Sequence, residues 1–414
     1  MKFFLPQALW VYPGHTNNGK RFDMRIVDGV LAVCENVAEP NEQDVVLPEG
    51  LNISPGWIDI GANFCDPGDS QKETLSSGLN AAEKGGYTHV AISPRTQPIA
   101  DNKSTIAYWK RESRNFKTKI LPIAALSQNL ENINLAELFD LVSNGSLAFS
   151  DGGKPISNTL FLKVALEYAA SVNAVVMIRP DDPYLVDSGE LWEGVEATLA
   201  GIPSRPSFSE EMAIERLGHL IEYSNCKVHF TSISTSGGLR AIEKLKKSGL
   251  KISCDVQVAH IALDEQLIHT YDSLYKHQPP LPNSITKSEL LNALKSGLID
   301  HLASGHEPVN PESKICEFKH ALPGISCIEA TFSMWCTSDA NLKADDVAMR
   351  LSISPRKILN IELPNWQVGH PINATVFSMT DNSVFTKENW LSKSKNFPWF
   401  QKALKGKVYN CFGE

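Results

Sequence analysis

The sequence predicts an α/β protein built on a (β/α)8 barrel, with a small composite β-sandwich domain made from both ends of the chain. Three observations lead to this fold class. Short apolar runs rich in β-branched residues alternate with helical segments through the middle of the chain, as a (β/α)8 barrel requires. Both ends carry strand-like pieces separated by Gly, Asn and Pro. The glycine-rich first turn that is typical of a doubly wound sheet is absent.

The middle of the chain, residues 55–360, supplies the barrel. Eight strands are expected at Trp57–Ile60, His89–Ser93, Ile120–Ala125, Leu147–Phe149, Ala174–Ile178, Val228–Thr231, Ile252–Val256 and His301–Ser304. Helical spacing of apolar residues is found between them at Glu73–Lys84, Thr159–Ser171, Ser209–Tyr223, Gly237–Lys247 and Lys287–Lys295. This alternation places the carboxyl ends of eight parallel strands at one mouth, where barrels carry their functional residues.

The two ends, residues 1–54 and 361–414, are assigned to the composite β domain. The expected strands are Leu9–Tyr12, Arg25–Val27, Gly29–Cys34, Asp44–Leu47, Ala374–Ser378 and Ser383–Phe385. The apolar start Met1–Pro6 is interrupted by Pro6 and is followed by no small-residue cleavage site, so it is interpreted as a first strand and not as a signal peptide.

Composition and charge exclude several classes of function. The 414 residues include 39 Lys and Arg and 47 Asp and Glu, which gives a net charge of −8 and no reason to expect a nucleic-acid or anionic-membrane surface. No apolar run approaches the roughly 20 residues of a membrane helix. The eight cysteines are scattered without a C-x-x-C pair, which indicates a reducing, cytoplasmic compartment.

Several short blocks match one known family in order and spacing. They are Pro55–Asp59, Asp66–Gly68, Ala148–Gly153, Ser234-Thr235, Cys254–Val256, Pro279–Leu281 and Gly324–Glu329. Together they make the chain resemble the dihydroorotase family of the amidohydrolase superfamily over nearly its whole length. The resemblance implies a (β/α)8 barrel of the amidohydrolase type that uses a divalent metal, zinc in most members, to interconvert dihydroorotate and carbamoyl aspartate.

The residues at the family's functional positions differ from those the family requires. The positions of the metal ligands, the general base and the substrate-holding arginine carry Gly61, Asn63, Cys65, Asp151, Arg179, Ser232 and Gly305. Gly61 and Asn63 stand in the H-x-H pair, and Gly305 stands at the aspartate that is also the general base. Cys65 takes the place of the arginine that holds the substrate carboxylate. Only Asp151 keeps a carboxylate, beside Gly152 where the family has a second aspartate.

Metal-assisted hydrolysis needs a cluster of ligands to hold the ion and a base to accept a proton. Because these positions are replaced, we predict a pseudoenzyme with no catalytic residues, no cofactor and no metal. Asp151 is the one remaining candidate for a metal ligand. His229, His260 and His306 are interpreted as structural hydrogen-bonding residues, and Cys65 as a buried, inert thiol.

The mouth keeps residues that suit an acidic ligand. The ligand-binding candidates are Arg95, Arg179, Gln278 and His306. Arg179 stands where the family has a histidine ligand, and a guanidinium there can pair with Asp151 or hold a carboxylate or phosphate in a bidentate manner. The internal ion pair with Asp151 is the favoured interpretation.

Three functional hypotheses therefore remain. The first is a scaffold or regulatory partner in pyrimidine biosynthesis, with aspartate transcarbamoylase as the partner that the resemblance suggests and a homo-oligomer as the other. The second is an active dihydroorotase, or related cyclic amidohydrolase, with an unusual site. The third is a sensor of a small carboxylic acid.

Overall fold

The barrel that the sequence predicts is present. The computed structural model describes residues 1–36, 38–186 and 189–413, and within them eight parallel strands are hydrogen-bonded in chain order into one sheet. These strands are β6 (Trp57–Ala62), β7 (Tyr87–Ile92), β8 (Lys119–Ala125), β9 (Ala148–Ser150), β10 (Val175–Ile178), β13 (Lys227–Phe230), β14 (Ile252–Gln257) and β15 (His301–Ala303). Each expected barrel strand coincides with one of them to within two residues.

The first and last strands close the barrel through side-chain and main-chain bonds. The backbone N–H of Ser304, after β15, donates to Oδ1 of Asp59 on β6 at 2.7 Å, and the N–H of Asn63 donates to the carbonyl of His306 at 2.9 Å. Asp59 is fully buried, and burial raises the pKa of its carboxyl to about 6. The aspartate of the Pro55–Asp59 block therefore has a structural role in closing the barrel.

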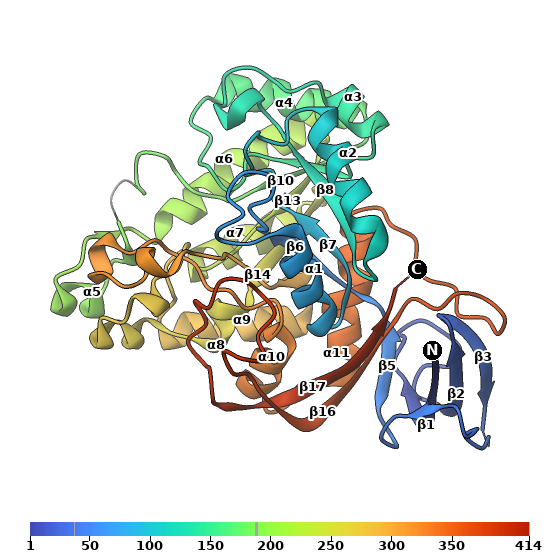
Figure 1. Cartoon of the computed structure of the whole chain (residues 1–414). Coiled ribbons are helices and arrows are strands. Elements are labelled where there is room, and N and C mark those ends of the chain that lie inside the picture. Colours follow the sequence, from blue (N-terminus) through green and yellow to red (C-terminus); the bar gives the residue numbers. More distant parts are fainter. Residues whose placement is uncertain (37, 187–188, 414) are drawn as a thin grey trace.

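Helices cover the outside of this sheet (Figure 1). The helices of the described residues are α1 (Leu75–Lys84), α2 (Lys103–Glu112), α3 (Leu138–Ser143), α4 (Thr159–Ser171), α5 (Val195–Ala200), α6 (Phe208–Ser224), α7 (Ser236–Lys247), α8 (Val258–Ala262), α9 (Ser284–Ser296), α10 (Thr331–Ser338), α11 (Ala344–Ala348) and α12 (Ser354–Ile358), of which α5 lies at the edge of the molecule, away from the barrel strands. The five expected helices correspond to α1, α4, α6, α7 and α9. Helix α2 is not predicted because it buries only Thr105, Ile106 and Trp109 among polar neighbours, although Asn102 caps its first turn.

Both ends of the chain join one further sheet, seen in Figure 1 where the blue and red strands meet. Its strand order is β17-β16-β5-β1-β2-β3, with β4 paired to β1. The bounds are β1 (Lys2–Trp10), β2 (Arg21–Val27), β3 (Val30–Glu35), β4 (Val45–Val46), β5 (Asn52–Pro55), β16 (Ala374–Val384) and β17 (Ala403–Phe412). A separate short ladder joins β11 (Leu191–Trp192) to β12 (Ser204–Arg205).

Two details of this sheet differ from the prediction. Met1–Pro6 and Leu9–Tyr12, expected as two strands, belong largely to one strand, β1, in which Pro6 lies at an irregularity in the pairing with β2 between Leu5 and Ala8. Ala374–Ser378 and Ser383–Phe385 belong largely to one strand, β16, whose register with β17 shifts between Ser378 and Asn382. A polar interruption in the sequence thus marks a bulge and not a turn. The boundaries at residues 54 and 360 stay a prediction.

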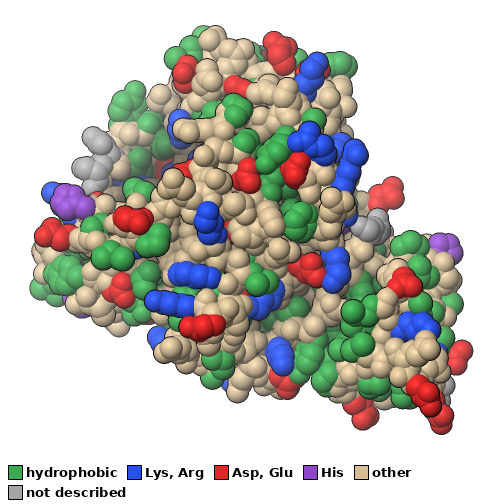
Figure 2. All heavy atoms as spheres, in the orientation of Figure 1, with side chains coloured by type: hydrophobic (Ala, Val, Ile, Leu, Met, Phe, Trp, Pro, Cys, Tyr) green, Lys and Arg blue, Asp and Glu red, His purple; other side chains and the backbone are tan. Residues whose placement is uncertain are grey.

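The segment between β16 and β17 is tied to the barrel by buried carboxylates. Glu73 accepts the N–H of Lys393 at 2.9 Å, and Glu329 accepts the N–H groups of Leu391 and Ser392 at 2.7 and 2.8 Å. On the face in Figure 2, charges of both signs are spread among neutral side chains. In the described ranges no helix has the length and hydrophobicity needed to cross a bilayer.

Candidate functional site

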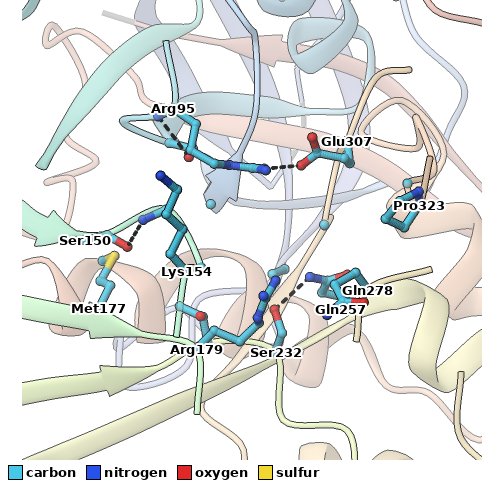
Figure 3. Close-up of a pocket in the computed structure, with 18 of the residues that line it drawn as sticks. Arg95, Ser150, Lys154, Met177, Arg179, Ser232, Gln257, Gln278, Glu307 and Pro323 are labelled. Atoms are coloured by element: carbon cyan, nitrogen blue, oxygen red, sulfur yellow. Dashed lines mark hydrogen bonds and ion pairs between the residues drawn. The ribbon is translucent and has the colours of Figure 1, made fainter. Parts of the chain in front are cut away.

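A cavity lies at the carboxyl ends of the barrel strands, where barrels carry their functional residues (Figure 3). Its volume is about 510 Å³. The polar and charged residues that line it include Lys72, Ser93, Arg95, Ser150, Lys154, Arg179, Thr231, Ser232, Asp255, Gln257, His277, Gln278 and Glu307. The mouth therefore lies where the expected barrel strands place it.

The structure separates the seven family positions into two groups. Gly61, Arg179, Ser232 and Gly305 line the cavity, whereas Asn63, Cys65 and Asp151 are buried beside it. Asn63 donates from Nδ2 to Glu307 at 3.0 Å and accepts the N–H of Cys65 at 3.1 Å through its Oδ1. Both ends of its amide thus have partners within the chain.

Two side chains now fill the space of the missing acidic groups. Gly152 has φ +64°, and a Cβ built on it would lie 2.4 Å from Cγ of Arg95. Gly305 has φ +61°, and a Cβ there would lie 2.5 Å from Oε1 of Gln257. Because non-bonded carbon atoms pack at about 3.5–4.0 Å, neither position accepts a side chain while Arg95 and Gln257 stay where they are.

Arg179 does not form the ion pair that the sequence analysis favours. Its Nε donates to Asp181 at 2.8 Å, two residues along the chain, and not to Asp151. Asp151 instead accepts the N–H and the hydroxyl of Ser127, each at 3.1 Å. Burial raises the pKa of the Asp151 carboxyl above its usual range. Asp151, the residue after β9, thus binds the neighbouring loop at Ser127, while Arg179 is paired with Asp181.

The four ligand-binding candidates are not all brought together. Arg95, Arg179 and Gln278 line the cavity, and Arg95 is ion-paired with Glu307 across the mouth (Figure 3). His306 is fully buried behind the wall, where its Nδ1 accepts the N–H groups of Cys327 and Ile328 at 3.2 and 3.3 Å. His306 therefore has the hydrogen-bonding surroundings of a structural residue.

The remaining histidines and Cys65 are also held inside the protein. His229 bonds Asp255 at 2.8 Å through Nε2, and His260 bonds the carbonyl of Pro279 at 3.2 Å through its own Nε2. Burial lowers the pKa of His260 well below its usual value. Cys65 is 5% exposed, and burial raises the pKa of its thiol to about 12. The thiol is protonated at neutral pH, as expected of an inert cysteine.

Comparison with known proteins agrees with the family resemblance. The family model described as dihydro-orotase-like matches residues 50–237. A dihydroorotase from Syntrophus aciditrophicus is 31% identical over 413 residues, which cover 99% of this chain and 97% of that protein. The chain belongs to the dihydroorotase family. A dihydroorotase from Geobacter metallireducens is also 31% identical, over 93% of this chain and 92% of its own.

Solved structures confirm the amidohydrolase-type fold of this dihydroorotase-family chain. An L-hydantoinase (dihydropyrimidinase) from Arthrobacter aurescens superposes with a TM-score of 0.84 over all of this chain and 96% of its own, at 17% sequence identity. A D-hydantoinase superposes with a TM-score of 0.80 over 100% and 95% of the two chains, at 19% identity. At this level of identity the likeness concerns the fold alone.

The residues at the mouth do not fit the divalent metal of the dihydroorotase family. Among the described residues, no group of three or more His, Cys, Asp or Glu side chains is arranged to hold a metal ion. Arg179 puts a permanent positive charge at a ligand position, which repels a second cation. The two glycines at the acidic positions are packed against Arg95 and Gln257. No hydrolytic step through a metal can be derived from these residues.

Among the residues of the mouth that the sequence did not predict are Lys154, Gln257 and Glu307. Lys154 follows β9 by four residues, and Gln257 ends β14 with its side chain in the cavity. Glu307 stands where the family block of the last strand has alanine. Glu307 follows β15 and Arg95 follows β7, the strands on either side of β6 in the closed barrel, so two new side chains of opposite charge at these positions were a usable signal for an ion pair.

Proposed function

We propose that this chain is a non-catalytic member of the dihydroorotase family that serves pyrimidine biosynthesis as a scaffold or regulatory partner. The observation that carries the proposal is the change of side chains at the mouth. Arg95 and Gln257 occupy the space of the family's acidic ligands, and Arg179 places a positive charge where the family has a metal ligand. Hydrolysis of a cyclic amide by this family's route needs a polarising metal and a general base. Gly305, at the position of that base, has no side chain to accept a proton.

The proposed partner is aspartate transcarbamoylase, which rests on the resemblance to inactive family members associated with that enzyme. A second copy of this chain is the other partner to consider. Affinity purification of the tagged chain from its own cells, followed by size-exclusion chromatography with light scattering, tests both. Co-purification at a fixed ratio supports the transcarbamoylase. A monomer that retains no transcarbamoylase at any concentration rejects the scaffold role.

An active dihydroorotase is the second candidate, and the comparisons fit it better than they fit inactivity. Full-length relatives at about 30% identity carry the name dihydroorotase. Activity in this chain would have to use groups outside the family's ligand set, and Glu307 is the cavity-lining carboxylate on the loop after β15. This candidate predicts turnover that depends on Glu307.

The deciding experiment measures conversion of dihydroorotate in both directions, with excess zinc or manganese and an active family member as the positive control. Metal content is measured on the same sample by elemental analysis. No turnover together with substoichiometric metal supports the non-catalytic proposal. Turnover that survives repurification, found together with stoichiometric metal, would overturn it.

A pair of variants separates true activity from a contaminating enzyme. Glu307→Gln removes the carboxylate at the mouth, whereas Glu312→Gln changes an exposed residue outside the cavity. Turnover lost in the first variant and kept in the second belongs to this chain and establishes the active candidate. Equal turnover in both, falling in parallel on further purification, indicates a contaminant.

A further inference from the structure

The cavity at the barrel mouth is positively charged although the protein as a whole is acidic. The cavity lining contains two carboxylates, Asp255 and Glu307, and four cationic side chains. These cations are Lys72, Arg95, Lys154 and Arg179. The chain itself has a net charge of −8. A cavity that is lined by cations and has low-dielectric walls concentrates negatively charged ligands inside it, although the net negative charge of the whole protein repels them.

Two of these four cations are neutralised by carboxylates of their own. Lys72 lies 2.6 Å from Asp69, three residues earlier in the chain. Arg95 forms its ion pair with Glu307, which Asn63 holds in place through a 3.0 Å hydrogen bond. These two pairs leave no net charge for a ligand, so they form the rim of the site and not its binding groups.

Arg179 is only partly neutralised. Its Nε bonds Asp181, but Asp181 also lies 3.8 Å from Nη1 of Arg205, so one carboxylate serves two guanidinium groups. Arg205 is 1% exposed and its nitrogen atoms form no hydrogen bonds with the described residues. An excess positive charge is therefore built into the wall below the cavity. In Figure 3 the guanidinium of Arg179 extends into the cavity beside Ser232, Gln257 and Gln278.

Lys154 is the second cation with free binding capacity. Its Nζ donates to the carbonyl of Leu130 at 3.2 Å, and it forms no ion pair within the described residues. Gly153, beside it, has φ +81°, and a Cβ there would lie 3.1 Å from Nη1 of Arg179. The missing side chain at Gly153 thus gives the Arg179 guanidinium the space in which it lies.

We propose that the mouth binds a small acid, a carboxylate or a phosphate, between Arg179 and Lys154. The proposal rests on the non-catalytic function, because the anion takes the side of the cavity where the family holds its metal. It is a different subsite from the family's carboxylate arginine, whose position is the buried Cys65. Two terminal nitrogens of a guanidinium and one ammonium group match the oxygen atoms of either acid.

The side chains beside Arg179 specify the rest of the ligand. Gln257 donates from Nε2 to Ser232 at 2.7 Å, which fixes its amide, and leaves Oε1 buried without a hydrogen-bond partner among the described residues. A buried acceptor of this kind favours a ligand with a matching donor. The ligand is therefore an acid that also carries an O–H or N–H group, of a size that a cavity of about 510 Å³ admits.

Calorimetric titration of the full chain tests this with four probes: succinate, L-malate, inorganic phosphate and glycerol 3-phosphate. The carboxylate and phosphate pairs distinguish the two acids, and L-malate against succinate tests for the donor group. We expect saturable binding by one acid class, tighter for the probe that carries the hydroxyl group. Arg179→Gln and Lys154→Met should each weaken it at least tenfold, whereas Lys247→Met, on the exposed face of α7, should leave it unchanged.

The outcomes keep this inference separate from the proposed function. The anion site is overturned if no probe gives heat, or if the Arg179→Gln and Lys154→Met variants bind with the affinity of the parent protein. Either outcome leaves the non-catalytic proposal intact. Binding lost in both variants establishes the site. Melting temperatures of the variants within about 2 °C of the parent protein show that the loss is not caused by unfolding. Turnover and metal content measured on the same samples decide the proposed function independently.

Discussion

The contact between Gly152 and Arg95 gives a prediction that can be worked out in free energy. In Gly152→Ala, the new Cβ lies 2.4 Å from Cγ and 2.9 Å from Cδ of Arg95. The left-handed backbone at this glycine adds a strain of about 1 kcal/mol for a residue with a side chain. Forcing Arg95 aside adds about 1–3 kcal/mol. We expect unfolding to become easier by about 3 kcal/mol.

Removing the obstacle should remove most of this cost. In an Arg95→Ala background the Cγ and Cδ atoms are absent, so Gly152→Ala costs only the backbone strain of about 1 kcal/mol. With an unfolding entropy of about 2.1 cal/mol/K per residue, 414 residues lower Tm by about 1 °C for each kcal/mol. Gly152→Ala should thus lower Tm by about 3 °C in the parent protein and about 1 °C in the Arg95→Ala protein.

Differential scanning calorimetry of the four proteins measures both shifts. Gly19→Ala is the matched control, because Gly19 has φ +79° and no atom within 4 Å of a built Cβ. That control should cost the backbone strain alone in both backgrounds. An equal loss of Tm for Gly152→Ala with and without Arg95 would refute the claim that Arg95 fills the vacated space.

Three further predictions concern other parts of the molecule. Burial raises the pKa of Glu210 to about 7, above the ordinary 4.5 of the unfolded chain, so its contribution to stability is present at low pH and lost as pH rises to 7. The unfolding free energy of the parent protein minus that of Glu210→Gln should therefore fall by about 2–3 kcal/mol between pH 5 and 7.5, measured by urea titration; a constant difference would contradict the pKa. Arg356→Met should lower Tm by about 3 °C or more, since it removes a charged donor from the carbonyl of Gly56 and from Oδ1 of Asn373 and leaves each with a single hydroxyl donor, from Ser352 and Thr88; a shift below 1 °C would show that these hydroxyl groups suffice. Native titration with a thiol reagent should label one cysteine quickly, the exposed Cys316, and Cys316→Ser should abolish that fast phase.

The barrel could be predicted from the sequence because its signals are local and repeated. The run Ala174–Ile178 is apolar on both faces, as a buried parallel strand must be, and β10 forms there. Thr159–Ser171 carries an apolar stripe at helical spacing and forms α4 over the same range. The family positions could also be found, because flanking blocks such as Pro55–Asp59 fix their register.

The interactions inside the mouth could not be predicted in the same way. Arg179 pairs with Asp181 and not with Asp151, and this pairing depends on the direction of a long side chain that neighbouring loops constrain. The packing of Arg95 into the space at Gly152 joins residues from two different strand ends. Sequence spacing gives the order of such residues but does not tell which of their side chains pack against one another.

The sheet that joins both ends of the chain cannot be completed until the chain is almost fully synthesised. Strand β5 pairs with β1 soon after both are made, but its other edge pairs with β16, more than 300 residues later. At about 5–20 residues per second on the ribosome, that edge waits on the order of 15–60 s for its partner strand. During this interval its unpaired N–H and C=O groups are open to any other strand. The yield of folded protein should therefore depend on how fast the middle of the chain is translated.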